Sequence, residues 1–185
     1  LDKLLANMGY GSRKEVKALL KQKAVRVDDE IVKDSSLHVD PSKQNVTVFG
    51  ERVEYVEYIY LMMHKPQGVI SATEDKYDRT VIDLLDPIDQ HFEPFPVGRL
   101  DKDTEGLLLI TNDGQLAHNL LSPKKHVPKW YYAKIDCKVT ESDIELFKQG
   151  VTLDDGYHTK PGELKILASG EQSEIELMIQ EGKFH

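Results

Sequence analysis

A polar loop that leads directly into a short apolar run places the strongest constraint on how this chain folds. Residues 98–105 are mostly charged or small, and Leu107-Leu108-Leu109-Ile110 follows almost at once. A short apolar run bounded by polar residues is typical of a buried strand. The start of a strand on a rigid core can hold one reactive side chain in a fixed place. The candidate in this loop is Asp101, with Arg99 two residues before it.

The same loop resembles a calcium-binding loop over its first half. Carboxylates recur at alternate positions, at Asp101, Asp103 and Glu105, and a glycine follows. The match then fails, because the twelfth position is Asn112 where a bidentate glutamate is needed. A plain solvated turn is the other alternative that these residue types allow. We expect no metal here, and the seven histidines of the chain form no ligand-like cluster.

Length and composition narrow the class of protein. The chain has 185 residues, enough for a small domain followed by a medium one. Its apolar fraction of 39% and charged fraction of 30% suit a soluble globular protein. The single cysteine, Cys137, excludes an internal disulfide framework and a cysteine-rich zinc site. With no membrane-length apolar run and no signal-peptide pattern at its start, we expect a cytoplasmic protein.

Charge is distributed unevenly along the chain. The net charge is -8, yet residues 1–26 contain seven basic and only two acidic side chains. This region can bind phosphates even though the rest of the chain is acidic. Its basic side chains include Arg13, Lys14 and Lys17, which lie off the apolar face of an expected helix. A solvated helix surface is the alternative explanation for them.

Two helices are expected over residues 2–23, on either side of a break at Gly9 and Gly11. Ser12 is a suitable N-cap for the second helix, and Glu15 lies three residues later. This pair predicts a capping box, in which each residue accepts a backbone hydrogen bond from the other.

The remaining elements divide the chain into two expected domains. A hairpin across Asp28-Asp29 and a closing strand over residues 46–49 complete a first domain of residues 1–49. Residues 50–57 are a charged linker, and residues 58–185 form the second domain. Strands are expected at 58–63, 107–110, 131–139, 164–167 and 175–179. Short helices are expected at 80–85, after 114 and at 142–149, and residues 86–97 are expected to be irregular. Many strands with few helices between them indicate an α+β domain with a mixed, mainly antiparallel sheet.

Five segments, in order along the chain, resemble the motifs of one enzyme family. They are Asn7 to Arg26, Lys65-Pro66-Gln67-Gly68 with Ser71-Ala72-Thr73, Gly98-Arg99-Leu100-Asp101 with Thr104 and Gly106, Lys129-Trp130-Tyr131, and Glu181-Gly182-Lys183-Phe184-His185. They are similar to motifs of the pseudouridine synthases, in the family named for ribosomal small subunit pseudouridine synthase A. The resemblance covers almost the whole chain. It implies an N-terminal alpha-L RNA-binding domain, as in a ribosomal small-subunit protein, followed by a pseudouridine synthase catalytic domain.

The resemblance also implies a reaction and roles for particular residues. The reaction is the site-specific isomerisation of uridine to pseudouridine in ribosomal RNA, without a cofactor. Asp101 would be the catalytic carboxylate, acting as a nucleophile or as a base. Arg99 would fill the gap left by the extruded nucleotide or bind the RNA backbone. Tyr131 would stack on the flipped base, and Lys183 lies in the motif that supplies a basic partner for the carboxylate.

Each of these roles has a structural alternative. Arg99 can form a salt bridge with the neighbouring acids, and Tyr131 can be a core aromatic of its strand. Trp130 points to the opposite face of that strand, so Trp130 and Tyr131 cannot line one pocket. Asp103 is the competing carboxylate, and we assign it to the surface because the family motif places the reactive acid directly after Leu100.

The expected partner is ribosomal RNA or an assembling ribosomal subunit, bound by a monomer that has no membrane association. The residues Thr159 to Leu164 and the form of the N-terminal motif favour the small subunit. One alternative is a large-subunit synthase, and another is a non-catalytic RNA-binding or ribosome-assembly protein. A hydrolase using Asp101 and Asp103 is a third, although paired acids usually come from separate elements. The family motif continues past His185, so we expect the catalytic domain to be truncated at its C-terminus.

Overall fold

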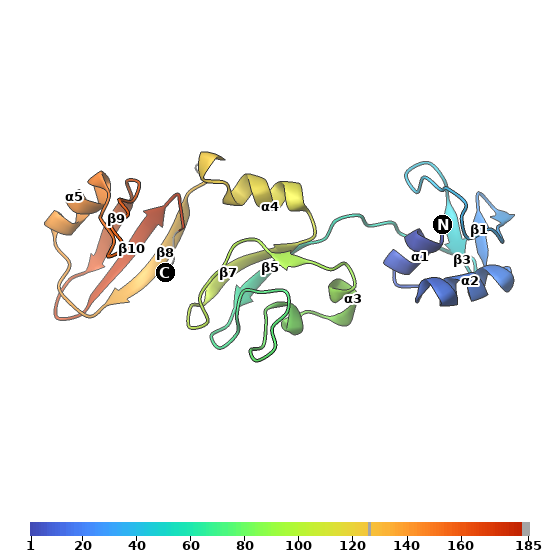
Figure 1. Cartoon of the computed structure of the whole chain (residues 1–185), viewed down its shortest axis with the longest axis horizontal. Helices are drawn as coiled ribbons and strands as arrows, with labels where there is room; N and C mark the ends of the chain where they lie inside the picture. Colours follow the sequence, from blue (N-terminus) through green and yellow to red (C-terminus); the bar gives the residue numbers. More distant parts are fainter. Residues whose placement is uncertain (126, 183–185) are drawn as a thin grey trace. The chain divides into compact units, whose positions relative to one another are not determined.

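The computed structural model describes residues 1–125 and 127–182 of the chain. These residues divide into two compact units, of which the first is Leu1–Gly114 and the second begins at Gln115. Figure 1 shows the elements in chain order. Three sheets are present among the described residues, and every strand pairing within them is antiparallel. Helices occur together with these sheets, so the predicted α+β class is confirmed.

The N-terminal part of the first unit contains two helices and one small sheet. The elements are α1 (Asp2–Asn7), α2 (Arg13–Lys21), β1 (Val25–Val27), β2 (Glu30–Ile31), β3 (Val46–Val48) and β4 (Glu51–Arg52). The strand order is β2-β1-β3-β4. The predicted helices and the predicted hairpin are therefore confirmed. Asp28 and Asp29 form the hairpin turn with φ values of 49° and 67°, a region that Asp tolerates better than most residues.

The capping box at the start of α2 is also confirmed. The Ser12 hydroxyl accepts a hydrogen bond from the Glu15 amide at 3.4 Å, and the Glu15 carboxylate accepts one from the Ser12 amide at 2.7 Å. On the opposite face, Val16 and Leu20 are buried against Leu5 and the valines of β1 and β3. The cap fixes where α2 begins, and this apolar face fixes how it packs on the sheet.

The expected linker over residues 50–57 begins later than the sequence indicates. Glu51 and Arg52 pair with β3, and Val53 donates its amide to the Val46 carbonyl at 2.8 Å. Val53 is 7% exposed and belongs to the same apolar core as the helices. The sequence does not indicate this strand, because its side chains are charged. Charged side chains are compatible with an edge strand, which can expose both of its faces to solvent.

The second part of the first unit is a three-stranded sheet with the order β5-β7-β6. Its elements are β5 (Tyr60–Lys65), a 3-10 turn η1 (Ile82–Leu84), α3 (Pro87–Gln90), β6 (Phe95–Pro96) and β7 (Gly106–Thr111). The expected strand at 58–63 therefore lies two residues further along, and the expected helix at 80–85 is only a 3-10 turn. Residues 86–97, expected to be irregular, contain α3 and β6. Pro87 stands at the first turn of α3, where its missing amide proton costs nothing.

β7 is not buried along its whole length, which corrects the expectation of a wholly buried strand. Leu108 and Ile110 are 3% and 0% exposed and form a core with Val69 and Val81. Leu107 points to the other face and is 66% exposed. The alternation follows from strand geometry, since successive side chains point to opposite faces of the sheet.

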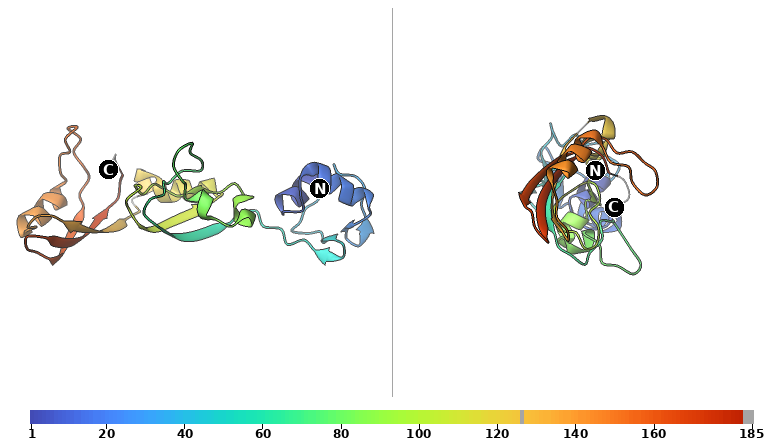
Figure 2. Two further views of the ribbon diagram at one scale, coloured as in Figure 1. Left: turned by 90° about the horizontal axis from the view of Figure 1, so that it is seen from below. Right: turned by 90° about the vertical axis from the view of Figure 1, so that its left-hand side faces the viewer.

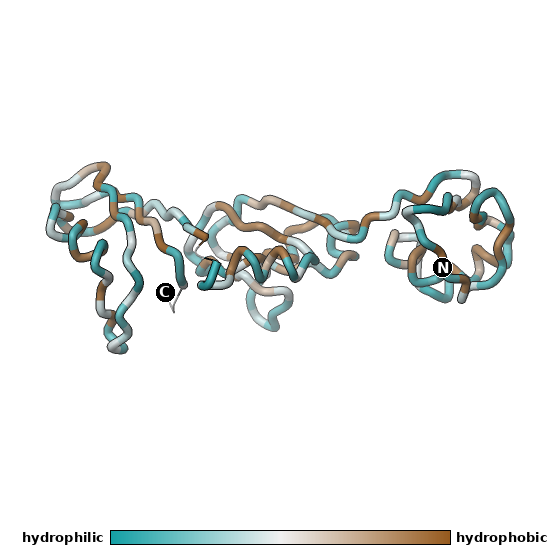
Figure 3. The backbone as a smooth tube through the Cα atoms, turned by 90° about the horizontal axis from the view of Figure 1, so that it is seen from above, coloured by the Kyte–Doolittle hydropathy of each residue, from teal (hydrophilic) through white to brown (hydrophobic). Residues whose placement is uncertain are grey.

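The second unit contains one helix-covered sheet with the strand order β8-β10-β9. The elements from the unit boundary onward are α4 (Gly114–Leu121), a 3-10 turn η2 (Pro123–Lys125), β8 (Lys129–Ile135), α5 (Glu141–Gln149), β9 (Glu163–Ala168) and β10 (Ser173–Ile179). The expected helices after 114 and at 142–149 are present. Figure 3 shows hydrophilic and hydrophobic residues alternating along α4, as an amphipathic helix requires.

The first strand of this sheet ends four residues earlier than the sequence indicates. β8 stops at Ile135, and the buried Ser173 hydroxyl then bonds the turn that follows. It donates to the Cys137 carbonyl at 2.7 Å and accepts from the Val139 amide at 3.1 Å. The apolar Val139 is buried in the core with Leu164 and Ile175, but as part of this turn and not as part of the strand.

Candidate active site

Asp101 lies in the loop that joins β6 to β7, and its side chain is exposed. Gly98 turns the chain into this loop with a φ of 94°, a conformation that favours glycine. The loop is closed locally by a hydrogen bond of 3.0 Å from the Thr104 amide to the Asp101 carbonyl. The carboxylate can be reached from solvent, and the closed loop limits the freedom of its backbone.

A second segment, residues 65–71, holds this loop at three alternate residues. The Ser71 hydroxyl donates to the Leu100 carbonyl at 2.9 Å and accepts from the Leu100 amide at 3.0 Å. The Gly68 amide donates to the Lys102 carbonyl at 2.7 Å. These bonds act on the residues directly before and after Asp101. The carboxylate is thus carried by a backbone that is fixed on both sides.

Lys65 makes the third attachment and is fully buried. Its ammonium donates to the carbonyl of Thr104 at 2.7 Å and to that of Pro66 at 3.0 Å. Burial lowers the pKa of Lys65, and the negative charges of Asp103 and Asp101 act in the opposite direction. A buried charge is tolerated only with such hydrogen-bond partners. The sequence places Lys65 and Ser71 in a motif but gives neither residue a role. The position of Lys65 at the end of an apolar strand is the only sequence feature that indicates its burial.

The charged neighbours of Asp101 lie in different environments. Lys102 pairs with Asp78 at 2.6 Å, while Arg99 is exposed and makes no ion pair within the described parts of the chain. The salt-bridge alternative for Arg99 therefore has no support here, and its guanidinium remains available for phosphate. Asp103 is exposed in the same loop as Asp101, so the two acids do not come from separate elements as in most paired-acid hydrolases.

Tyr131 belongs to β8 in the second unit and stands opposite Leu177 of β10. Its side chain is half-buried, and burial raises the pKa of its hydroxyl. Trp130 is 47% exposed on the other face, where the Lys165 ammonium lies 4.3 Å from its ring centroid. The two neighbouring aromatics thus face opposite ways, as strand geometry requires. Asp101 and Arg99 belong to the first unit, and Tyr131 belongs to the second.

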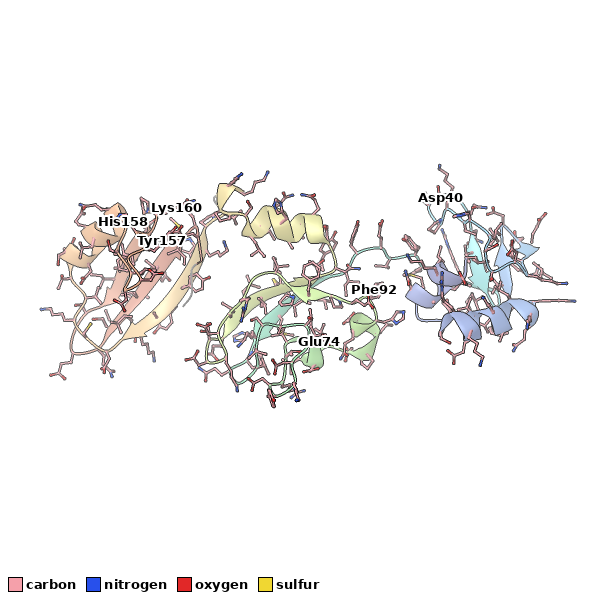
Figure 4. All side chains as sticks on the ribbon, in the orientation of Figure 1. Asp40, Glu74, Phe92, Tyr157, His158 and Lys160 are labelled. Atoms are coloured by element: carbon pink, nitrogen blue, oxygen red, sulfur yellow. The ribbon has the colours of Figure 1, made fainter. Side chains whose placement is uncertain are left out.

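The last motif is described only in part. Lys183, the predicted basic partner, lies outside the described residues. Glu181 accepts hydrogen bonds from the Lys160 amide at 2.7 Å and from the Tyr157 hydroxyl at 2.9 Å. Figure 4 shows Tyr157, His158 and Lys160 grouped on one hairpin. The sequence does not reveal this connection, because Glu181 is 21 and 24 residues away from its partners.

The basic residues of the N-terminal region lie on the solvent side of α2. Arg13, Lys14 and Lys17 are all exposed, and Arg13 is 3.5 Å from Asp2. Exposed pairs of this kind contribute little to stability, so these cations remain available to phosphates.

No group of three His, Cys, Asp or Glu side chains able to hold a metal occurs among the described residues. None of the described helices is long and apolar enough to cross a membrane.

Two family models match the chain. The model for RNA pseudouridylate synthase matches residues 59–185, and the model for the S4 domain matches residues 1–45. The first match covers the Asp101 loop, the segment that holds it, and β8 with Tyr131. The second covers both N-terminal helices and the basic face of α2.

Curated relatives match over nearly the full chain. A Bacillus subtilis protein named uncharacterized RNA pseudouridine synthase YtzG is 60% identical over 187 residues, which cover 100% of this chain and 78% of that protein. Bacillus subtilis ribosomal large subunit pseudouridine synthase B is 36% identical and covers 99% of this chain and 75% of its own length. Vibrio cholerae ribosomal small subunit pseudouridine synthase A is also 36% identical, and the match covers 100% of this chain and 78% of that protein.

One solved structure is similar along the whole chain. A crystal structure of a pseudouridylate synthase superposes with a TM-score of 0.63 at 32% sequence identity. The match covers 100% of this chain and 78% of that one. The chain is therefore similar in fold to a solved pseudouridylate synthase.

Proposed function

The chain belongs to the RNA pseudouridine synthases with an N-terminal S4 domain, and we propose on that basis that it isomerises a specific uridine of ribosomal RNA, with Asp101 as the catalytic carboxylate. The observation that carries the proposal is the exposed Asp101 on a loop fixed by the 65–71 segment. A catalytic group needs such support, because its position relative to the substrate must hold to within about 0.5 Å.

The reaction exchanges one bond to the ribose for another. The bond between base N1 and sugar C1′ breaks, the base turns, and a bond between base C5 and C1′ forms. A proton leaves C5 and a proton is added to N1, so the product is an isomer and no oxidant or reductant is consumed. The Asp101 carboxylate acts at the sugar, as a nucleophile or as a base. Both roles require its negative charge and its exposure.

The other proposed residues bind the RNA. Extrusion of the target nucleotide costs a few kcal/mol. Arg99 offsets this cost by occupying the gap or binding the backbone, and Tyr131 stacks on the extruded base, a contact worth about 1–3 kcal/mol. Lys183 supplies the basic partner of the carboxylate. In the N-terminal domain Arg13, Lys14 and Lys17 bind phosphates.

We propose the two domains indicated by the sequence, with the end of the first moved to residue 53 by β4. The substrate proposed is small-subunit ribosomal RNA, free or in an assembling subunit, bound by a cytoplasmic bacterial monomer. The residues Thr159 to Leu164 favour this choice over the large subunit. Relatives named for each subunit are equally identical to the chain, at 36%.

Release of tritium tests the assignment of Asp101. RNA containing [5-³H]uridine loses its label when C5 forms the new bond. We expect Asp101→Asn to reduce release by about 100- to 10,000-fold, because the amide keeps the shape but not the charge. Asp103→Asn is the matched control, since it removes an exposed acid from the same loop and should keep most activity.

Two results would contradict the proposal. Equal release by the wild type and Asp101→Asn would remove Asp101 from the reaction, and release by neither would favour a non-catalytic RNA-binding protein. Pseudouridine mapping in both ribosomal RNAs from a strain lacking the gene then distinguishes the subunits. Loss of a modified site from the large-subunit RNA alone would overturn the choice of substrate.

A further inference from the structure

Residues 71–79 form a loop that projects from the β5-β7-β6 sheet (Figure 2). Its residues Ser71 and Asp78 contact the loop that carries Asp101. The two ends of this projecting loop are joined by the bridge between Ile70 and Thr80. The Ile70 amide donates to the Arg79 carbonyl at 3.0 Å, and the Val81 amide donates to the Ile70 carbonyl at 3.0 Å. The loop is therefore closed at its base.

The tip of the projecting loop is held in a defined turn. The Asp75 carboxylate accepts hydrogen bonds from the Tyr77 and Asp78 amides, each at 2.8 Å. These bonds lower the pKa of Asp75, so it remains ionised at neutral pH and the turn persists. An ordered turn presents its side chains at a smaller entropic cost on binding than a flexible one.

Tyr77 is presented to solvent at this tip. Its side chain is 86% exposed, the largest value among the described large hydrophobic residues. The Lys76 ammonium lies 5.3 Å from the centroid of its ring. Arg79 is also exposed and makes no ion pair within the described residues. Glu74, labelled in Figure 4, and Asp75 are exposed acids of the same loop.

The projecting loop is attached to the Asp101 loop at both ends. Ser71 bonds the peptide of Leu100, and Asp78 pairs with Lys102 at 2.6 Å. These two partners are the residues directly before and after Asp101. The ion pair also offsets the negative charge of Asp78. Tyr77 and Asp101 are therefore each one residue away from the two partners of this ion pair.

We propose that Tyr77 is an RNA-contacting residue that stacks on an unpaired nucleotide beside the target uridine, with Lys76 and Arg79 binding the adjacent phosphates. This inference rests on the proposed function and names a contact that determines where the substrate docks. Every base has a π-face, so an exposed aromatic flanked by cations accepts single-stranded RNA of varied sequence. The contact requires no change of the loop, which is already ordered.

The test uses the full chain and a [5-³H]uridine-labelled transcript of small-subunit ribosomal RNA. Tyr77→Ala should raise KM about tenfold and leave kcat unchanged, because the stack contributes to binding and not to the chemical step. The slope of log KM against log salt should stay the same, since no charge is removed. Tyr77→Trp, which keeps an aromatic face, should restore the wild-type KM.

Ile88→Ala is the matched control, because Ile88 is 72% exposed in α3 of the same unit and should leave KM unchanged. Equilibrium binding is measured in an Asp101→Asn background, so that the Tyr77 contact is tested whether or not label is released. A wild-type Kd for the Tyr77→Ala variant in that background would overturn the inference. Absence of label release by the wild type would instead remove the proposed function, which keeps the two failures distinct.

Discussion

The charged ammonium of Lys65 is buried in the first unit. Two backbone carbonyls accept its hydrogen bonds in place of water. Taking an ammonium out of water is unfavourable, and this is why burial lowers the pKa of Lys65. The nearby Asp103 and Asp101 reduce the effect without removing it. The ammonium donates to the Thr104 carbonyl, and the amide of the same residue closes the loop by donating to the Asp101 carbonyl.

The lowered pKa predicts how stability depends on pH. The unfolded chain binds more protons than the folded chain at pH values between the lowered pKa of Lys65 and its ordinary value of 10.5. The free energy of unfolding contributed by this group therefore rises with pH across that window. Lys65→Met lacks the titrating group. We expect the free energy of unfolding of the wild type, minus that of Lys65→Met, to rise between neutral pH and pH 10. Urea unfolding measures both values, and a difference that falls with pH would contradict the prediction.

At the scale of elements, two loops are joined by the hydrogen bonds of Ser71. The hydroxyl bonds both the amide and the carbonyl of Leu100, so this one buried side chain fixes the residue directly before Asp101. Loops are usually the most mobile parts of a protein. This one is fixed by the neighbouring 66–71 segment and by Lys65 at the end of β5.

Removal of that hydroxyl should affect turnover more than RNA binding. We expect Ser71→Ala to lower kcat by up to about 100-fold, because a displacement of about 1 Å is enough for such a loss. The Kd for RNA should stay close to that of the wild type. Both values come from label release and equilibrium binding.

Ser173→Ala provides the matched control for Ser71→Ala. Ser173 is also buried and also bonds one amide and one carbonyl, but in the turn after β8. Both variants should lose stability, by about 1–3 kcal/mol for the unsatisfied backbone groups. Only Ser71→Ala should lose kcat per folded molecule. An equal loss of kcat in both variants would show a general effect of reduced stability and not a positioning role.

At the scale of the whole molecule, the chain combines a basic N-terminal region with an acidic remainder. The net charge is -8, while residues 1–26 contain an excess of basic side chains. An acidic chain repels RNA on average, so we expect RNA to approach where basic side chains such as those of α2 are exposed.

This charge distribution predicts that the salt dependence of RNA binding comes mainly from the basic side chains of α2. Replacement of Arg13, Lys14 and Lys17 by Gln should reduce the slope of log Kd against log salt by about 2–3, if each neutralises one phosphate. Replacement of the exposed Lys33, Lys43 and Lys138 by Gln changes the net charge equally and should leave the slope nearly unchanged. Filter binding across salt concentrations measures both. Equal slopes for the two triple variants would contradict a role for α2.

The sequence by itself determined the features that depend on neighbours a few residues apart. The capping box of Ser12 and Glu15, most helices, most strands and the loop before Leu107-Leu108-Leu109-Ile110 follow from local patterns of polarity and turn residues. The family was also readable from motifs in order along the chain, and the comparisons confirm it.

Tertiary structure alone decided the features that depend on distant residues. Ser71 meets Leu100 across 29 positions and Lys65 meets Thr104 across 39, and no local pattern encodes either contact. The same holds for the strand made by Glu51 and Arg52, and for the exposed Leu107 in an apolar run. Burial is set by what the rest of the chain places against a residue, so polarity patterns predict where elements form and packing determines which side chains are covered.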